Sequence, residues 1–308
     1  MMQPLRLVLV VCTSLAAACS AVASHPEAPA EATQRAPRSI PVFDGHTGEP
    51  ASWDTLAAAI DDAEVVILGE LHGHPVGLPF DAALFTAALL RHPDAALCLE
   101  FLTRDGQYLV DAYLAGLIDW DTFAAGVSRA AGSDPLPHRP LLEAARDAGI
   151  TTIAANAPRI YTRAAKERGY EALEALGPEQ QRLFDVPIEL PSGPYREGFF
   201  EMMASHSEDA PAASEPDPAL VDKFRAQALW DGTLSASVAR ALDAGWRPVF
   251  LVVGSYHCNR DGGTVQVLRQ RRPSTRTLVV SFVAEDAEVL RDEDQDLADF
   301  VAYVGAFP

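Results

Sequence analysis

Five short apolar runs constrain the fold of this 308-residue chain more than any other feature of its sequence. The runs cover residues 65–68, 96–99, 151–155, 249–253 and 278–283. Each is continuous rather than alternating, a pattern typical of strands buried on both faces of a parallel sheet. Helical patterns lie between them, at residues 52–61, 78–90, 105–115, 119–127 and 141–148. Strands that alternate with helices predict an α/β fold, with a mostly parallel sheet flanked by helices.

A long stretch without a convincing strand separates the third run from the fourth. It spans about residues 157–245 and predicts a smaller helical cap or insert within the α/β domain. Helical patterns within it cover residues 160–168, 178–184, 195–206 and 218–244. Residues 207–218 are acidic and rich in proline, which predicts a loop inside this cap.

The first 19 residues have the pattern of a secretory signal peptide. A basic start that includes Arg6 precedes an apolar stretch too short to span a membrane, and small residues follow it. The segment "LAAAC" is similar to the lipobox of bacterial lipoproteins, which implies lipidation of Cys19. Ala16 departs from the usual leucine, so ordinary signal-peptidase cleavage remains an alternative. Ser20, where Asp would favour the inner membrane, implies an anchor in the outer membrane with the protein facing the periplasm.

Composition separates the remainder into a tether and a folded domain. Residues 20–39 are rich in Ala, Pro, Glu and Ser and contain no aromatic residue, which predicts a disordered tether before the domain at 40–308. The formal net charge is −19, and about −20 without Arg6, so nucleic acid is excluded as a partner. Cys98 and Cys258 remain as thiols; two buried free cysteines or one disulfide are both compatible with the sequence.

Polar residues follow four of the apolar runs, at the point where each run ends. Glu70 and His72 follow the first run, Glu100 the second, Asn156 the third and His257 the fourth. Because the carboxyl ends of parallel strands meet at one edge, these side chains are expected to share a crevice there. The alternative is that each is only a solvated strand end.

Five segments, taken in order, resemble the motifs of the ChaN family of haem-binding lipoproteins within the Tiki superfamily. They are "ILGELHGHP", "LCLEFLTRDGQYLVDAYLAGLIDW", "PLLEAARDAGITTIAANAPR", "FRAQALWDGTLSASVARAL" and "VVGSYHCN". The resemblance runs from about residue 65 to about residue 268. It implies an α/β core with a smaller helical part, haem as the ligand, and a role in haem-iron acquisition. Some relatives in the superfamily are metal-dependent proteases that use a Glu-x-His motif and a distant His.

The motifs assign a set of crevice residues by position. This set contains Glu70, His72, Glu100, Asn156, Gln227, Asp231 and His257. The chain departs from the family pattern where Asp and further His are usual, since it has Gly73, Gly77 and Leu78, and Leu234 replaces a methionine. His74 lies nearby at a different spacing. These departures weaken a metal-hydrolase interpretation more than haem binding.

Haem binding is the first functional hypothesis, because haem requires an apolar slot and an axial His, Tyr, Met or Cys. The candidate ligands are Tyr195, Met202, His206, Tyr256 and His257. The first three recur on one face of the helix predicted at 195–206, although such a stripe is also what packs a cap onto a core. Expected partners are haem, the membrane through lipidated Cys19, an outer-membrane haem receptor and a second copy in a homodimer.

A metal-dependent hydrolase is the alternative hypothesis. In it Glu70, His72 and His257 would hold a divalent metal and leave one position open. Catalysis would then use Glu70 together with Glu100 or Asp231 as base or orienting group. A purely structural lipoprotein would leave the polar strand ends unexplained. The sequence contains no Walker A, Rossmann glycine or Gly-x-Ser-x-Gly pattern.

Overall fold

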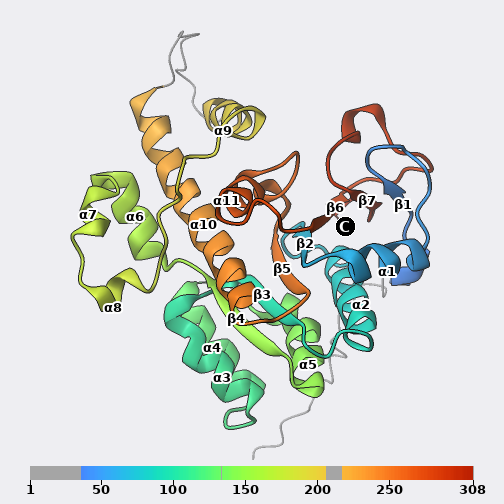
Figure 1. Ribbon diagram of the computed structural model, residues 1–308, viewed down its shortest axis with the longest axis horizontal. Helices are drawn as coiled ribbons and strands as arrows, with labels where there is room; N and C mark the ends of the chain where they lie inside the picture. Colours follow the sequence, from blue (N-terminus) through green and yellow to red (C-terminus); the bar gives the residue numbers. More distant parts are fainter. Residues whose placement is uncertain (1–35, 133, 206–216, 308) are drawn as a thin grey trace, which may run out of the picture. The chain divides into compact units, whose positions relative to one another are not determined.

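A seven-stranded sheet organises the computed structural model, which describes residues 36–132, 134–205 and 217–307 (Figure 1). Its strands are β1 (Val42–Asp44), β2 (Val65–Glu70), β3 (Ala96–Thr103), β4 (Thr151–Asn156), β5 (Val249–Gly254), β6 (Thr277–Val283) and β7 (Phe300–Tyr303). They lie in the order β1-β7-β6-β2-β5-β3-β4. The predicted signal peptide, Cys19, the predicted tether as far as residue 35, and His206 all lie outside the described residues.

Every pairing in the sheet is parallel except that of β1 with β7. The prediction of an α/β fold with a mostly parallel sheet is therefore confirmed. The five predicted runs correspond to β2 through β6, while β1 and β7 were not predicted. These two strands have three and four residues, too few for a periodic pattern to stand out.

Helices connect the strands. Those before β4 are α1 (Trp53–Asp62), α2 (Gly77–Leu89), α3 (Gln107–Leu114), α4 (Trp120–Ala131) and α5 (Arg139–Ala148). Those between β4 and β5 are α6 (Arg159–Arg168), α7 (Glu171–Glu174), α8 (Pro178–Gln181), α9 (Pro194–Ser205) and α10 (Pro218–Asp243). The helix α11 (Gly263–Arg271) follows β5. Five short 3₁₀ turns complete the described elements: η1 (Pro37–Ser39), η2 (Arg104–Gly106), η3 (Leu136–His138), η4 (Ser255–His257) and η5 (Asp292–Asp294).

Local sequence sets the ends of these helices. The Ser52 hydroxyl accepts a hydrogen bond from the Thr55 amide at 3.1 Å, and the Thr55 hydroxyl accepts one from the Ser52 amide, which forms a capping box for α1. The α4 and α5 helices end at Gly132 and Gly149, both with positive φ, a conformation that favours glycine.

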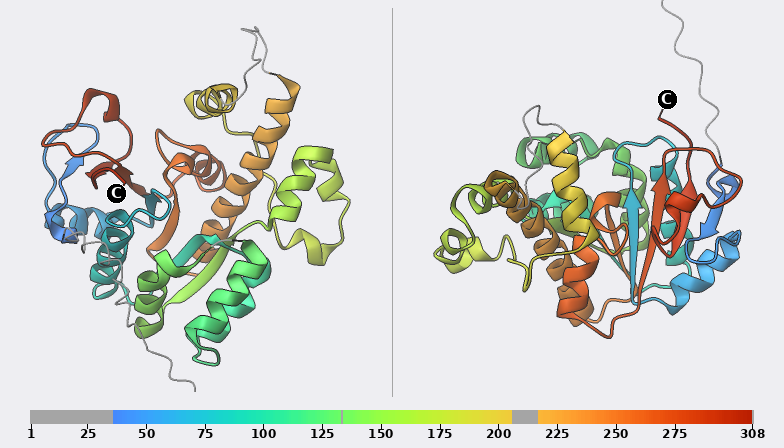
Figure 2. Two further views of the ribbon diagram at one scale, coloured as in Figure 1. Left: turned by 180° about the vertical axis from the view of Figure 1, so that it is seen from behind. Right: turned by 90° about the horizontal axis from the view of Figure 1, so that it is seen from above.

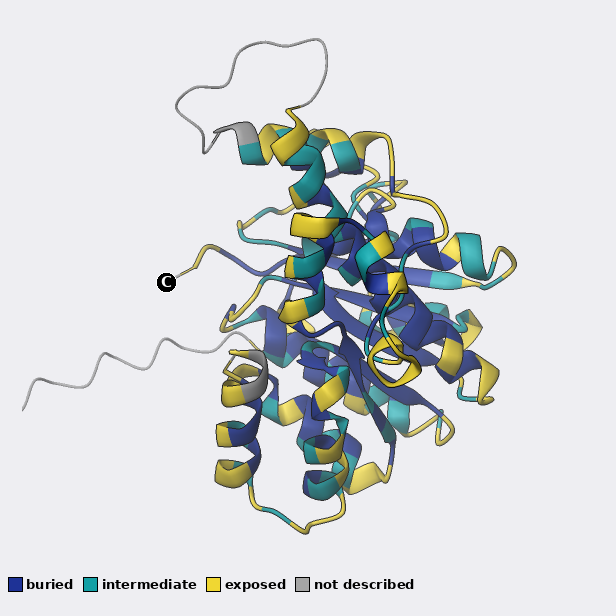
Figure 3. Ribbon diagram, turned by 90° about the vertical axis from the view of Figure 1, so that its left-hand side faces the viewer, coloured by how far each residue is buried: buried dark blue, intermediate teal, exposed yellow. Residues whose placement is uncertain are grey.

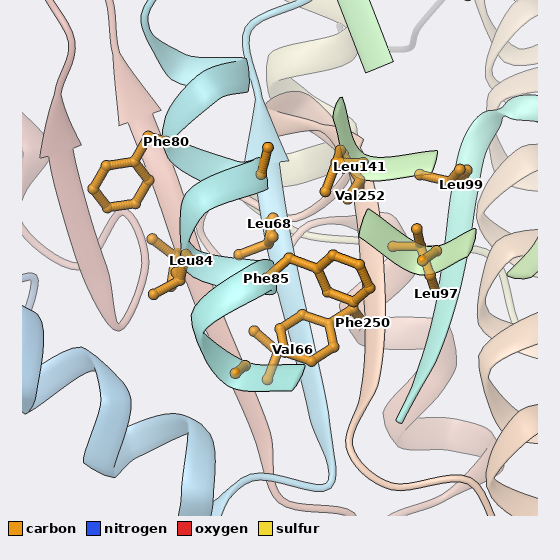
Figure 4. Packing of buried hydrophobic residues seen from close by; sticks show 14 of the residues in the cluster. Val66, Leu68, Phe80, Leu84, Phe85, Leu97, Leu99, Leu141, Phe250 and Val252 are labelled. Atoms are coloured by element: carbon orange, nitrogen blue, oxygen red, sulfur yellow. The ribbon is translucent and has the colours of Figure 1, made fainter. Parts of the chain in front are cut away.

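The two faces of the sheet pack against different helices (Figure 2). Val66 and Leu68 of β2 belong to a core that includes Phe85 of α2, whose ring lies 5.1 Å from that of Phe250 (Figure 4). Val65 and Ile67 point to the other face, where α10 and α11 pack. The strands are buried on both faces, and exposed residues lie on the outer surfaces of the helices (Figure 3). Continuous apolar runs are therefore what this sheet requires.

Cys98 and Cys258 are both buried and free, so the structure contains the two thiols and not the disulfide. Within the described residues, no helix is long and apolar enough to span a membrane.

Parallel pairing aligns the carboxyl ends of the four neighbouring strands β2, β5, β3 and β4. In the register of the sheet, Glu70 lies beside Gly254, and Thr103 lies beside Asn156. The residues that follow these strands therefore meet at one edge, where ligands of open α/β sheets bind.

Candidate functional site

A cavity of about 580 Å³ opens at this edge, a size within the usual range for small-molecule sites. Its walls come from the ends of β2, β3, β4 and β5 and from loops and helices that reach over them. The lining residues are His72, Gly73, Glu100, Phe101, Thr103, Asp134, Pro137, His138, Asn156, Ala157, Arg159, Trp230 and His257.

Glu70 lies behind the cavity and connects two imidazoles. Its Oε1 lies 2.7 Å from Nδ1 of His72, and its Oε2 lies 2.6 Å from Nε2 of His138. Burial disfavours the charged carboxylate, but these two hydrogen bonds and the charges of the two histidines outweigh that effect and lower the pKa of Glu70 to about 2. The Glu70 carboxylate is ionised and can only accept, so Nδ1 of His72 donates to it. When the imidazole of His72 is neutral, its one ring proton is therefore on Nδ1 and Nε2 carries none.

His72 itself is 69% exposed at the mouth of the site. The hydrogen bond to Glu70 raises the pKa of His72, burial opposes this, and the negative charges of Glu100 and Glu70 add to the rise. Gly254 permits the position of the ring, because a Cβ at Gly254 would lie 2.7 Å from Nε2 of His72. The backbone amide of Gly254 donates to Oε2 of Glu100 at 2.6 Å, which fixes that carboxylate beside the imidazole.

His257 forms the second imidazole–carboxylate pair of the site. Its Nδ1 lies 2.7 Å from Oδ1 of the fully buried Asp231, and its Nε2 lies 3.7 Å from Oε1 of Glu100. Burial disfavours the imidazolium, but the charges of Asp231 and Glu100 and the hydrogen bond to Asp231 raise the pKa of His257 to about 9. His257 is therefore a cation at neutral pH. Thr264 donates to the same Asp231 oxygen at 2.8 Å and holds it in place.

The long helix α10 contributes Gln227 as well as Asp231. The amide nitrogen of Gln227 lies 3.1 Å from the Tyr195 hydroxyl and 3.3 Å from Nε2 of His257. Both α10 residues therefore contact His257 from behind, outside the cavity lining. Asn156 lines the cavity, and its Oδ1 accepts a hydrogen bond from the amide of Ala157 at 2.9 Å.

Of the predicted haem ligands within the described residues, only His257 lines the cavity. Tyr195 is buried in an aromatic cluster with Phe199 and Phe224, and its hydroxyl donates to Asp231 at 2.7 Å. Burial and the charge of Asp231 raise its pKa well above the usual value. The Tyr256 hydroxyl donates to the Tyr195 carbonyl at 2.9 Å, and burial raises the pKa of Tyr256 to about 12. Met202 is 38% exposed on α9, outside the lining.

Among the lining residues that were not predicted from the sequence, three bear most on the chemistry of the site: His138, Arg159 and Trp230. His138 lies in η3, and its ring stacks on Phe101 at 4.1 Å. Arg159 begins α6, directly after the polar end of β4, and Trp230 precedes Asp231 on α10. Arg159 was detectable, since it ends the segment "NAPR" that follows the third run. His138 had no such signal, because no strand ends near it.

The predicted divalent-metal set, Glu70, His72 and His257, is not supported by the geometry. Both oxygens of Glu70 already accept hydrogen bonds, and His257 is held as a cation between two carboxylates. Within the described residues, no group of three or more His, Cys, Asp or Glu side chains is arranged to hold a metal ion.

The site contains two imidazoles. The ring of His72 is exposed, and buried Glu70 fixes its Nδ1. The ring of His257 is a cation and lies beside Glu100. Aromatic and apolar walls from Phe101, Pro137 and Trp230 surround them. Such an arrangement can supply a nitrogen ligand to a flat, largely apolar molecule or take part in proton transfer. Fold and site together define an α/β protein with a ligand site at the carboxyl edge of its sheet.

Comparison with known proteins narrows this class to one family. The model of the haem-binding uptake family ChaN, Tiki superfamily, matches residues 56–268, more than half of the chain. The chain therefore belongs to this family, as its motifs predicted. No curated protein matched the sequence.

A search of solved structures found ChaN of Campylobacter jejuni, which shares the fold. A structure of ChaN of Campylobacter jejuni, described as showing cofacial haem binding, is 16% identical with a TM-score of 0.58, and covers 85% of this chain and 96% of that one. The type III effector HopBA1 is 15% identical with a TM-score of 0.48, and covers 88% of this chain and 98% of that one. At 16% identity, the likeness to ChaN of Campylobacter jejuni concerns the fold alone.

Proposed function

We propose that the protein binds haem in the cavity at the carboxyl edge of the sheet, with His72 as the axial ligand. The hydrogen bond between Nδ1 of His72 and Glu70 carries this proposal. Ligating histidines usually donate their other ring N–H to a carboxylate, which fixes the tautomer and makes the free nitrogen more basic. His257 is a weaker candidate, because its ring is protonated at neutral pH and both of its nitrogens face carboxylates.

The other walls fit the same ligand. Phe101 and Trp230 provide aromatic surface, and Ala157 and Pro137 provide apolar surface, as a macrocycle requires. When bound, haem would supply an iron centre whose potential depends on this ligand and the surrounding polarity. The family description and the haem bound by the Campylobacter relative support this assignment.

A haemin titration followed by the Soret band tests the proposal. The wild-type protein should show a saturable shift, and His72→Ala should weaken binding at least tenfold. His92→Ala is the matched control, because His92 pairs with Asp61 and lies outside the cavity lining. Absence of a saturable shift in the wild-type protein would reject haem binding. An unchanged titration in His72→Ala would reject His72 as the ligand.

Hydrolysis is the second candidate function, and the contact between Glu100 and His257 favours it. A carboxylate and a cationic imidazole lie 3.7 Å apart in one cavity, as a general base and a general acid would. Assay of chromogenic esters and peptides with wild-type protein and Glu100→Gln tests this candidate. Turnover that Glu100→Gln abolishes would support hydrolysis, and equal background rates would reject it.

The N-terminal pattern and the family resemblance support a proposal for the cellular role. We propose a lipoprotein, anchored through Cys19 in the outer membrane and facing the periplasm, that serves haem-iron acquisition with an outer-membrane receptor as partner. In Cys19→Ala the protein should leave the membrane fraction for the soluble periplasm. A variant that still partitions with membranes would contradict the anchor.

A homodimer remains a proposal, which sedimentation with and without haemin would test.

A further inference from the structure

Among the described residues that line the cavity, one is a permanent cation. Arg159, the first residue of α6, is exposed and lines the cavity together with two acidic residues, Asp134 and Glu100. The chain as a whole has a formal net charge of −19, so an anionic ligand is repelled by most of its surface. A cation inside the cavity would therefore attract an anionic ligand to a place that the net charge of the chain otherwise disfavours.

Arg159 differs from the other cations near the site, because it has no acidic partner in the part of the chain that the structure describes. His72 pairs with Glu70, His257 with Asp231, and Arg104 with Asp185. Among the described residues, no carboxylate lies within ion-pair distance of Arg159. Its Nη1 lies 4.0 Å from the position of a Cβ at Gly132, where α4 ends. Glu100 accepts from Gly254, and Asp134 accepts from the amide of Leu136, so both neighbouring acids have other partners.

The start of α6 adds to the positive potential. No side chain caps this helix, whose N-cap is Pro158, so amides of the first turn remain without a side-chain acceptor. Ala157, just before the start of α6, and Arg159, its first residue, both line the cavity, so the positive end of the helix dipole faces the same cavity as Arg159. A guanidinium matches a carboxylate in geometry, since it donates two parallel hydrogen bonds.

We propose that Arg159 binds a carboxylate of the ligand and makes the cavity selective for porphyrins that carry free acid groups. This inference rests on the proposed haem function. It adds that the protein recognises the acid groups on one edge of the ligand. Haem fits this chemistry, because it has an apolar face for Phe101 and Trp230 and two propionates on one edge. An ester of the same macrocycle would keep the apolar face but would lack the negative charges of the propionates.

The test compares free acids with their dimethyl esters. Protoporphyrin IX, haemin and the two dimethyl esters are titrated against wild-type protein, with intrinsic tryptophan fluorescence and absorbance as readouts. Wild-type protein should bind each acid about tenfold more tightly than its ester. Arg159→Gln should lose this preference while its affinity for the esters stays unchanged, and Arg159→Lys should retain part of it.

Arg163→Gln is the matched control, because Arg163 is exposed on the same helix, one turn further along, and lies outside the cavity lining. It removes the same charge and should keep the preference. Equal binding of acid and ester by wild-type protein would overturn the inference, as would a preference that survives in Arg159→Gln. A purely structural role beside α4 would lower the Tm of Arg159→Gln and leave the preference intact. If none of the four porphyrins binds, the proposed function itself fails.

Discussion

Asp81 is a fully buried carboxyl group in α2, and neither of its oxygens has a hydrogen-bond partner within the described residues. Burial raises its pKa well above the usual value, and the negative charge of Glu70 raises it further. An acid whose pKa is higher in the folded state than in the unfolded chain opposes folding increasingly as pH rises above the unfolded value. Asp81 should therefore make the protein less stable toward neutral pH.

The variant Asp81→Asn should remove this dependence, because its side chain is similar in shape and takes up no proton. Relative to wild type, its free energy of unfolding should increase with pH above about 4, by up to about 1.4 kcal/mol per pH unit. Urea unfolding between pH 4 and 8 measures the difference. The exposed Asp62→Asn serves as control. A difference between Asp81→Asn and wild type that is constant with pH would show that Asp81 is ionised in the fold.

Residues of the site differ in how far sequence alone could find them. Glu70 and Asn156 end β2 and β4, Glu100 lies in the second half of β3, and His72 and His257 follow β2 and β5. All five were placed at the ends of apolar runs, so the rule for parallel sheets was enough to suggest that they meet. His138 and Trp230 reach the cavity from a 3₁₀ turn and a helix whose positions depend on tertiary packing. No local pattern specifies such positions, and both residues were missed.

At the level of elements, the end of β5 determines where the imidazole of His72 can lie. In Gly254→Ala the new Cβ would lie 2.7 Å from Nε2 and 2.9 Å from Cε1 of His72, so the ring must move away from the site. We expect haemin affinity to fall at least tenfold with little change in Tm, since only an exposed side chain is displaced. Gly106→Ala is the control, because a Cβ there contacts nothing within 4 Å. Unchanged haemin binding by Gly254→Ala would contradict the role of His72.

The helix α10 sets the charge of His257 through Asp231. Replacing Asp231 with Asn removes the nearest negative charge, so the pKa of His257 should fall from about 9 toward its usual 6.5. An NMR pH titration of the His257 ring measures this shift. Thr264→Val, which removes only a hydrogen bond to Asp231, should leave the pKa of His257 close to that of wild type. A pKa near 9 in Asp231→Asn would assign the effect to Glu100 instead.

Helices and strands were predictable from the sequence where a helical pattern was long or where a strand was buried on both faces. The helix α10, with 26 residues, and the five strands β2 to β6 followed from periodicity and continuous apolar runs. The aromatic stripe of α9 had two interpretations, and Tyr195 and Phe199 pack against Phe224 of α10 rather than facing the cavity. Periodicity identifies the buried face of a helix but does not say whether a ligand or another helix covers it.

For the whole molecule, the buried charges of the site predict how stability depends on pH. The pKa of Glu70 is lowered from 4.5 to about 2, so its contribution is present above 4.5 and is lost as pH falls toward 2. The pKa of His257 is raised from 6.5 to about 9, so its contribution is present below 6.5 and is lost as pH rises through 9. Each contribution is on the order of 3 kcal/mol. From Glu70 and His257 alone, stability should be greatest between pH 4.5 and 6.5, and the decline that Asp81 adds above about pH 4 moves the maximum of the wild-type protein toward the acid end of this range.

Urea unfolding of wild type, Glu70→Gln and His257→Gln from pH 2 to 10 tests this profile. Glu70→Gln should be less stable above pH 5 and should lose much of the decline on the acid side, because Gln has no proton to take up. His257→Gln should flatten the alkaline side in the same way and leave the acid side as in wild type. Asp81 also contributes to the decline toward neutral pH, so adding Asp81→Asn to His257→Gln should flatten that side further. An acid limb in Glu70→Gln as steep as that of wild type would show that the carboxylate between His72 and His138 is not the group whose protonation unfolds the protein.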